Sequence, residues 1–222
     1  MEPVIIQPAR EKVAAILRKA IFKGELKPGE VLSQEEIASK LGISRMPVRE
    51  AFQMLERDGL LMLQNRRGAV VRELTREAIQ EHYELRALLE GEAAARASLY
   101  GEDFTEVLSA LEQAEKTAQA GDMTGYVAAN EAFHRAIWEV GDGQRLHSLL
   151  HQLWNGLPTR LPELLNNQVQ RSLTEHRELV EAMTTRKPEE ARALMSHHIM
   201  RSFQDFIASR EHTQQNDESK EM

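Results

Sequence analysis

Residues 33–59, SQEEIASKLGISRMPVREAFQMLERDG, decide how the N-terminal part of the chain folds. Their apolar residues form two stripes at helical spacing, Ile37, Ala38 and Leu41 followed by Val48, Ala51, Phe52 and Leu55. Between the stripes, Gly42 suits the left-handed position after a helix, and Ser44 suits the N-cap of the next one. Two short helices joined by such a turn form a helix-turn-helix, so the stretch predicts a DNA-binding head.

The second helix of this motif begins with polar side chains that can contact DNA. Ser44, Arg45 and Arg49 lie at its N-terminal end, where recognition helices meet base edges and phosphates. These three residues are therefore the predicted contacts of the recognition helix.

Two short β-compatible runs follow the motif, LLML at 60–63 and AVVRE at 69–73. The turn between them carries Arg66, Arg67 and Gly68. Such a hairpin forms a wing whose cations reach a phosphate strand or the minor groove, and a glycine there lets the backbone come close. A charged loop in solvent is the alternative interpretation.

Composition limits the remaining possibilities. The 222 residues include no cysteine, so disulfides, thiolate metal sites and cysteine nucleophiles are excluded. No apolar run is long enough for a membrane span and the first residues do not resemble a signal peptide, so we expect a soluble cytoplasmic protein. Residues 1–76 contain 14 Lys and Arg against 10 Asp and Glu, whereas residues 77–222 contain 14 against 25. A basic head on an acidic body fits a protein that touches DNA with one part only.

After Thr75 the pattern predicts only helices, with Pro158 and Pro162 as interruptions. The expected helices begin near Arg76 and then span 104–120, 124–140, 144–156, a short 164–169, 172–185 and 188–209. The last residues are almost entirely polar and predict a disordered tail at 213–222. The predicted fold is mainly α: a winged helix-turn-helix over 1–75, then an all-α antiparallel helical bundle over 76–212.

Three histidines of the predicted bundle lie on apolar faces of three different helices. Asn130 and His134 are four residues apart on one inward stripe, and His176 and His198 lie on two others. A single core histidine usually makes only a structural hydrogen bond, but three that converge would be good ligands for a borderline divalent cation. Spacing alone leaves open whether they converge. A rival pair, His147 and His151, flanks its apolar stripe and is better explained as a half-exposed polar edge.

The N-terminal motifs resemble a known family. The stretch GELKPGEVLSQEEIASKLGISRMPVREAFQMLERDGLL at 24–61, followed by NRRGAVV at 65–71, is similar to the winged-helix head of the GntR family of bacterial transcription regulators. This resemblance implies DNA contacts from the recognition helix and the wing residues named above. Glu35 departs from the fatty-acid-responsive member, which has arginine there, so the operator sequence cannot be transferred from that relative.

The patterns YELRALLEGEAA, NEAFH, TEHRELVEAM and PEEARALMSHHI resemble the helical effector domain, called FCD, of the FadR branch of this family. The resemblance implies a divalent metal, zinc with nickel or another transition metal as alternatives, held by Asn130, His134, His176 and His198. Many members have Asp where this chain has Asn130, and an amide oxygen is the weaker donor. Arg86 is similar to an arginine that meets an effector carboxylate in some members; a salt bridge to Glu84 or Glu90 is the alternative.

Together these observations predict a nucleoid-associated transcriptional regulator rather than an enzyme. The resemblance to the family implies that it is a homodimer and a repressor. It would bind double-stranded operator DNA, and a small organic acid bound in the bundle would modulate its operator affinity. Two other classes remain possible at this point: a metal-dependent enzyme tethered to DNA, and a metal-independent structural DNA-binding protein.

Overall fold

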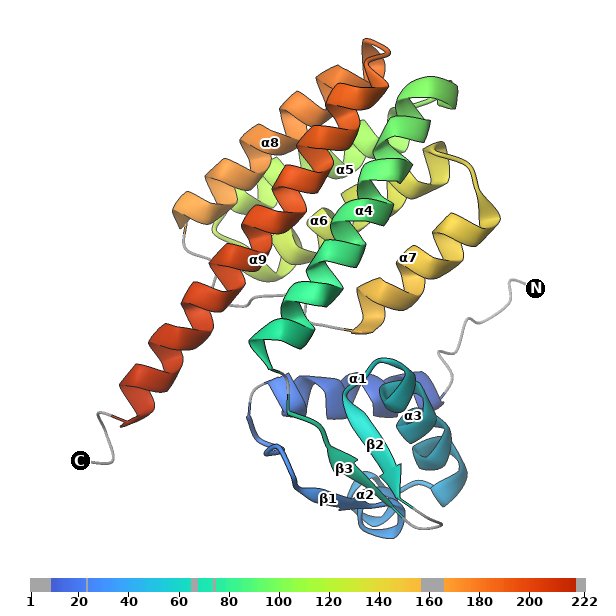
Figure 1. Cartoon of the computed structure of the whole chain (residues 1–222), viewed down its shortest axis with the longest axis vertical. Coiled ribbons are helices and arrows are strands. Elements are labelled where there is room, and N and C mark those ends of the chain that lie inside the picture. Colours follow the sequence, from blue (N-terminus) through green and yellow to red (C-terminus); the bar gives the residue numbers. More distant parts are fainter. Residues whose placement is uncertain (1–8, 23, 65–67, 74, 157–165, 219–222) are drawn as a thin grey trace. The chain divides into compact units, whose positions relative to one another are not determined.

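The computed structural model describes residues 9–22, 24–64, 68–73, 75–156 and 166–218. The chain forms two compact units, and each unit is described by itself (Figure 1). Among the described residues, the first unit comprises those up to Thr75 together with Asn155 and Gly156, and the second comprises those from Arg76 to Trp154 and from Asn166 onward. Among the described residues, no helix is both long enough and apolar enough to cross a membrane.

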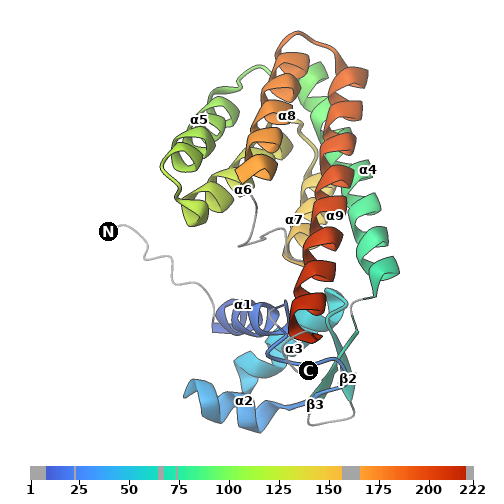
Figure 2. The same cartoon turned by 90° about the vertical axis from the view of Figure 1, so that its left-hand side faces the viewer.

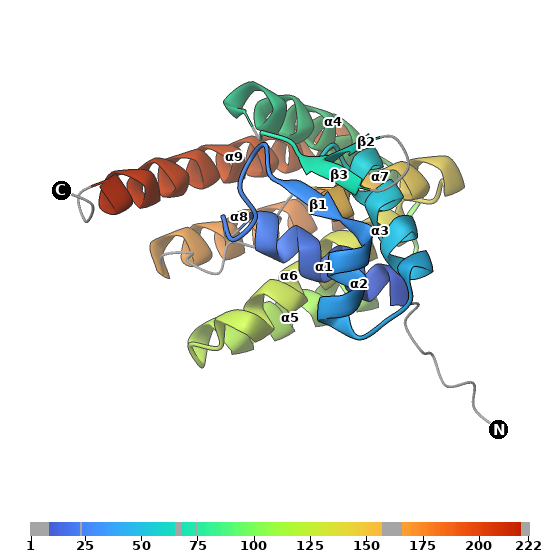
Figure 3. The same ribbon diagram turned by 90° about the horizontal axis from the view of Figure 1, so that it is seen from below.

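The first unit is the winged helix-turn-helix expected from the sequence. Its elements are α1 (Ala9–Phe22), β1 (Val31–Ser33), α2 (Gln34–Leu41), α3 (Arg45–Arg57), β2 (Leu61–Gln64) and β3 (Gly68–Val71). The strands form an antiparallel sheet in the order β1-β3-β2, beside the three helices (Figure 3). The two stripes of the helix-turn-helix pack into one core with α1 and the sheet.

The turn of the motif has the geometry that its sequence predicts. Ser33 caps α2, its side chain accepting a hydrogen bond from the Glu36 backbone N–H at 3.4 Å. Gly42 ends that helix with a φ of 65°, a left-handed conformation that glycine adopts without a steric penalty. Ser44 occupies the N-cap position of α3 in an extended conformation, yet its side chain makes no capping hydrogen bond.

The second unit is an all-helical bundle. Its helices are α4 (Arg76–Tyr100), α5 (Thr105–Gln119), α6 (Met123–Val140), α7 (Gln144–Gly156), α8 (Asn166–Thr184) and α9 (Pro188–Glu218). The closest pairs are α4 with α9 and α5 with α6 (Figure 2). Gly91 makes the first pairing possible, because a Cβ there would lie 2.5 Å from Ser196 Oγ on α9.

Two predictions about the helices are wrong. Residues 166–169 are the first turn of α8 rather than a separate short helix, while Leu164 and Leu165 lie outside the described residues. Helix α9 continues to Glu218, so the expected disorder of the tail fails for residues 213–218, although 219–222 are not described. A helix makes its backbone hydrogen bonds within itself, so a polar segment containing Gln and Glu can extend a packed helix without an apolar face.

Candidate functional site

The bundle brings together the three histidines that the sequence placed on inward faces. His134 comes from α6, His176 from α8 and His198 from α9, and all three side chains are buried. One ring nitrogen of each lies within 4.8 Å of those of the other two, and His176 Nε2 is 3.4 Å from His198 Nε2. Because the apolar faces of the three helices pack together, their three imidazoles form one cluster.

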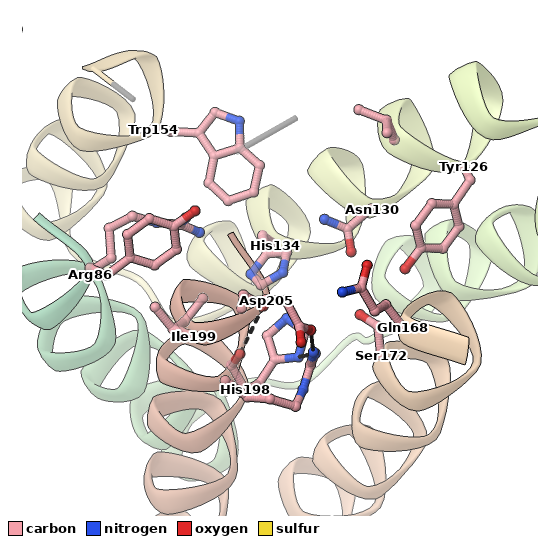
Figure 4. A pocket seen from close by; sticks show the side chains of 14 residues that line it. Arg86, Tyr126, Asn130, His134, Trp154, Gln168, Ser172, His198, Ile199 and Asp205 are labelled. Atoms are coloured by element: carbon pink, nitrogen blue, oxygen red, sulfur yellow. Dashed lines mark hydrogen bonds and ion pairs between the residues drawn. The ribbon is translucent and has the colours of Figure 1, made fainter. Parts of the chain in front are cut away.

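Asn130 lies one turn before His134 on α6 and is half-buried. Its side chain lines the same pocket as His134 and His198 and points toward them (Figure 4). An amide oxygen is therefore available beside the imidazoles.

Two carboxylates, one fully buried and one partly buried, fix the orientation of two of these rings. His134 Nδ1 lies 2.6 Å from Glu90 Oε2, and His198 Nδ1 lies 2.6 Å from Glu175 Oε2. A carboxylate acceptor holds the ring proton on Nδ1 and leaves the Nε2 lone pair available to a cation. The sequence analysis missed both pairings. The available signal was an acidic residue on an inward helical face, which Glu90 provides.

Burial and neighbouring charges keep these groups in the protonation states that coordination requires. Burial lowers the pKa of His198 to about 4, although its hydrogen bond to Glu175 opposes the shift. Burial also lowers the pKa of His176 well below its usual value, so both rings are neutral at neutral pH. Burial alone would raise the pKa of Glu90, but the charges of Arg86 and His134 outweigh it and bring that pKa down to about 2.

His176 differs from the other two histidines because no carboxylate of the described residues orients it. Its Nδ1 is buried without a hydrogen-bond partner, and its ring stacks on Phe133 with 4.2 Å between centroids. Packing rather than hydrogen bonding therefore sets the orientation of this ring.

The cluster fits a borderline divalent cation. Two nitrogens each about 2.0–2.1 Å from a zinc ion at a tetrahedral angle are about 3.4 Å apart, which matches the distance between His176 Nε2 and His198 Nε2. Three imidazoles and one amide oxygen form a donor set suited to zinc or nickel rather than to calcium or magnesium. These residues could hold such an ion.

Arg86 lies at the edge of the cluster and forms a salt bridge with Glu90, one of the two partners named in the alternative interpretation. The side chain is buried, and its Nε and Nη2 donate to Glu90 Oε1 at 2.9 and 2.6 Å. The guanidinium also lies over two aromatic rings, 4.7 Å from the centroid of Trp154 and 5.4 Å from that of Tyr83. Arg86 lines the pocket as well, so the ion pair does not remove it from reach of a ligand.

The pocket beside the cluster encloses about 650 Å³ of empty space, part of which is open to solvent. One side carries Arg86 and Trp154, and the other side is mostly polar (Figure 4). Besides the histidines and Arg86, the polar side chains of the lining include Tyr126, Asn130, Gln168, Ser172, Arg201 and Asp205. A mostly polar lining beside an arginine suits a small polar ligand.

The rival histidine pair belongs to a separate group. His147 and His151 are half-buried, as expected for a polar edge, and Glu139 from α6 joins them. The sequence analysis did not connect Glu139 with this pair.

In the first unit, the start of α3 presents the predicted DNA contacts. Ser44, Arg45 and Arg49 are all exposed. Arg45 Nη2 lies 3.0 Å from Glu35 Oε1 of α2, in an ion pair whose two side chains face solvent. Met46, which the sequence analysis did not single out, is 67% exposed on the same turn.

The wing forms, but Gly68 is not at an exposed tip. It is buried as the first residue of β3, and a Cβ there would lie 2.6 Å from the backbone oxygen of Leu32. The close approach of β1 therefore explains why glycine is needed at this position. The glycine allows the two strands to pack, and it does not lie at an exposed tip as expected. Arg66 and Arg67 lie outside the described residues.

Comparison with known proteins agrees with this two-part architecture. Residues 9–71 match the gntR family of bacterial regulatory proteins, and residues 81–201 match the FCD domain. YdhC of Bacillus subtilis, an uncharacterized HTH-type transcriptional regulator, is 32% identical over 79% of this chain and 81% of its own length. The gluconate operon transcriptional repressor of the same organism is 31% identical over 87% of this chain and 82% of its own.

Among solved structures, E. coli McbR/YncC has the same fold, with a TM-score of 0.70 at 23% identity, covering 90% of this chain and all of that one. These families and relatives are transcriptional regulators, which sets aside the interpretation as an enzyme. The chain therefore belongs to the GntR family of transcription regulators and carries an FCD domain behind its winged helix-turn-helix.

Proposed function

We propose that the protein is a repressor whose operator affinity is set by a small carboxylate, bound together with a divalent metal in the helical unit. The observation that carries this proposal is the joining of Arg86 and His134 by one buried carboxylate, Glu90. A cationic side chain for an organic acid and a nitrogen donor for a metal thus belong to one connected group beside one pocket.

The DNA-binding part rests on the exposed start of α3. Ser44, Arg45 and Arg49 face solvent on a helix that can enter the major groove, with Arg66 and Arg67 of the wing as further candidates. One winged helix makes few contacts, so we infer a homodimer that reads two half-sites of a near-palindromic operator. Such a regulator works in the cytoplasm, at the nucleoid.

His134, His176 and His198, with Asn130, would hold the metal, which is zinc or nickel by donor type. The bound ion would supply a positive centre that attracts oxygen atoms of the carboxylate ligand. The chain's own residues would do the rest: Arg86 would donate hydrogen bonds to the acid, and Glu90 and Glu175 hold the rings in place.

The ligand regulates only if it binds the DNA-competent and DNA-incompetent states with different affinity. Residues 73–77 connect the two units in the sequence and are where a change in α4 would reach the head. Because Arg86 and Glu90 lie on α4, a ligand that contacts Arg86 acts on the helix that follows the head directly.

The experiment combines metal analysis with DNA binding. Full-length protein would first select its operator from random duplexes, and fluorescence anisotropy would then follow binding at several salt concentrations. We expect Arg49→Ala to weaken binding and to lower the salt slope by about one unit, with Arg57→Ala at the other end of α3 as control. Unchanged operator binding by Arg49→Ala would refute the DNA-binding assignment.

The metal and ligand are tested on the same protein. The double variant His134→Ala/His176→Ala should lose the metal that the wild type retains on purification, as measured by elemental analysis. A thermal-shift screen of small carboxylic acids, gluconate included because a relative is named for the gluconate operon, should give hits that weaken operator binding. Metal retention by the double variant, or hits without any effect on DNA binding, would refute these parts.

A further inference from the structure

A second group of metal-ligating side chains lies outside the pocket, between the end of α6 and the first turns of α7. Glu139 of α6 and His147 and His151 of α7 offer one donor atom each, all within 4.8 Å of one another. His147 Nε2 is 2.6 Å from Glu139 Oε1 and 3.2 Å from His151 Nε2. Two imidazoles one turn apart on a helix, joined by a carboxylate, are a donor set for a borderline divalent cation.

The surroundings admit a cation and leave a net negative charge. The His147 side chain is 28% exposed and that of Glu139 is 70% exposed, so an ion can enter from solvent. The adjacent cation, Arg135, is paired with Glu131 through Nε and Nη2 at 3.0 and 2.9 Å. Together with Glu139, this pair gives the group one negative charge.

The protons of the two rings cannot satisfy all of these contacts. Arg135 Nη1 donates to His151 Nδ1 at 2.6 Å, which places the proton of a neutral His151 on Nε2, facing His147. The short contact with Glu139 requires a proton on His147 Nε2 as well. Two N–H groups would then face each other across 3.2 Å. A cation in place of those protons would accept a lone pair from each of the three donor atoms.

Binding of that cation has a cost at Arg135. With metal on its Nε2, a neutral His151 carries its proton on Nδ1 and no longer accepts the hydrogen bond from Arg135. Arg135 would then keep its ion pair with Glu131 and its place over the Trp138 ring, 6.0 Å from the centroid. The arginine and the metal therefore compete for His151.

The position of the group gives it a consequence for the pocket. The backbone of α7 approaches the other helices much less closely than α4 approaches α9. Side chains hold α7 instead, in a small cluster of Ala93, Trp138, Leu150 and Trp154. His147, His151 and Trp154 follow one another at i, i+4 and i+7 on one face of α7, and the Trp154 ring lies 4.7 Å from the Arg86 guanidinium.

We propose that Glu139, His147 and His151 form a second divalent-cation site, which fastens α7 to α6 and so fixes Trp154 beside Arg86. The site itself does not depend on a metal in the pocket. Only its influence on ligand affinity, which acts through Trp154, rests on the proposed function.

The test is the number of zinc ions bound by the metal-stripped full chain, titrated against a chromophoric chelator. We expect two ions for the wild type. His147→Ala should lose one, and His134→Ala/His176→Ala should lose the other. The exposed His197→Ala serves as control and should bind both. Arg135→Ala should bind the second ion more tightly, because it removes the competitor for His151.

The outcomes separate this proposal from the proposed function. A single ion that is lost only with the pocket histidines overturns the second site and leaves the pocket metal intact. A single ion that is lost only with His147 supports the second site and overturns the pocket metal. Weaker zinc binding by Arg135→Ala would overturn the competition that the contacts imply.

The fastening of α7 has its own measurement. In the His134→Ala/His176→Ala variant, zinc can act only through the second site. Added zinc should slow hydrogen–deuterium exchange in α7 by about tenfold or more, because the ion suppresses local opening of a weakly held helix. Exchange in α7 that zinc leaves unchanged would overturn this part of the proposal.

Discussion

Glu90 Oε2 lies 2.6 Å from His134 Nδ1, while Oε1 of the same carboxylate accepts both hydrogen bonds from Arg86. Glu90 comes from α4 and His134 from α6, and both side chains are almost completely buried. A single fully enclosed carboxylate thus sets the tautomer of one candidate metal ligand and neutralises the arginine beside it. Its loss should affect both groups.

We predict that Glu90→Gln weakens zinc binding in the pocket by about 10–100-fold, the usual effect of removing a carboxylate that orients a histidine ligand. The amide keeps the shape of the side chain but not its charge. Competition titration against a chelator measures the change. Glu92→Gln, a more exposed residue of the same helix that pairs with Arg192, is the matched control. Equal affinities of the two variants would contradict a role for Glu90 at the metal.

We predict that the metal-free helical unit loses stability as the pH falls from 6.5 toward 4. Burial lowers the pKa of His198 from 6.5 to about 4, so in this window the unfolded chain binds a proton that the folded chain does not. The contribution of this group to the free energy of unfolding should therefore be constant above pH 6.5. Below that pH it should fall by up to about 1.4 kcal/mol for each unit that the pH decreases.

Urea unfolding followed by tryptophan fluorescence tests this, since both tryptophans, Trp138 and Trp154, lie in the helical unit. His198→Gln should show a shallower fall between pH 7 and 4, with the remainder due to His176, whose pKa burial also lowers. If the free energy of unfolding of this variant falls with pH as steeply as that of the wild type, His198 is not the titrating group.

We predict that Glu35→Gln strengthens operator binding. In the structure Glu35 holds Arg45 in an exposed ion pair at 3.0 Å, and this pair has to open before the arginine can contact a phosphate or base. Exposed pairs are worth about 0–1 kcal/mol, so the gain should be at most about fivefold. Anisotropy titrations at fixed salt measure it, with Glu36→Gln as a control of equal charge. A gain of the same size in both variants would indicate a general charge effect.

We predict that Gly91→Ala destabilises the helical unit by about 1–3 kcal/mol, as overpacking of a close contact does. The added methyl group would lie 2.5 Å from Ser196 Oγ and 3.1 Å from the backbone oxygen of Arg192. Adding Ser196→Ala should restore part of the loss, because it removes the nearer of these two atoms. Urea unfolding of both variants measures the difference, and no recovery in the double variant would place the strain at the α9 backbone.

Local sequence determined the head almost completely. Neighbouring residues set the glycine turn, the Ser33 cap and the two stripes of the helix-turn-helix, because these depend on contacts within a few positions. The same periodicity placed His134, His176 and His198 on buried faces. It also predicted the half-buried edge of His147 and His151.

Only the tertiary structure decided which side chains meet. Glu90 and His134 are 44 positions apart, and their contact depends on the rotation and axial offset of two helices, which spacing within one helix does not encode. The same holds for Glu139 beside His147, where a turn between helices brings two groups together. Gly68 is a position where the local sequence misled. Its place in the sequence suggested an exposed wing tip, but the approach of β1 buries it against Leu32.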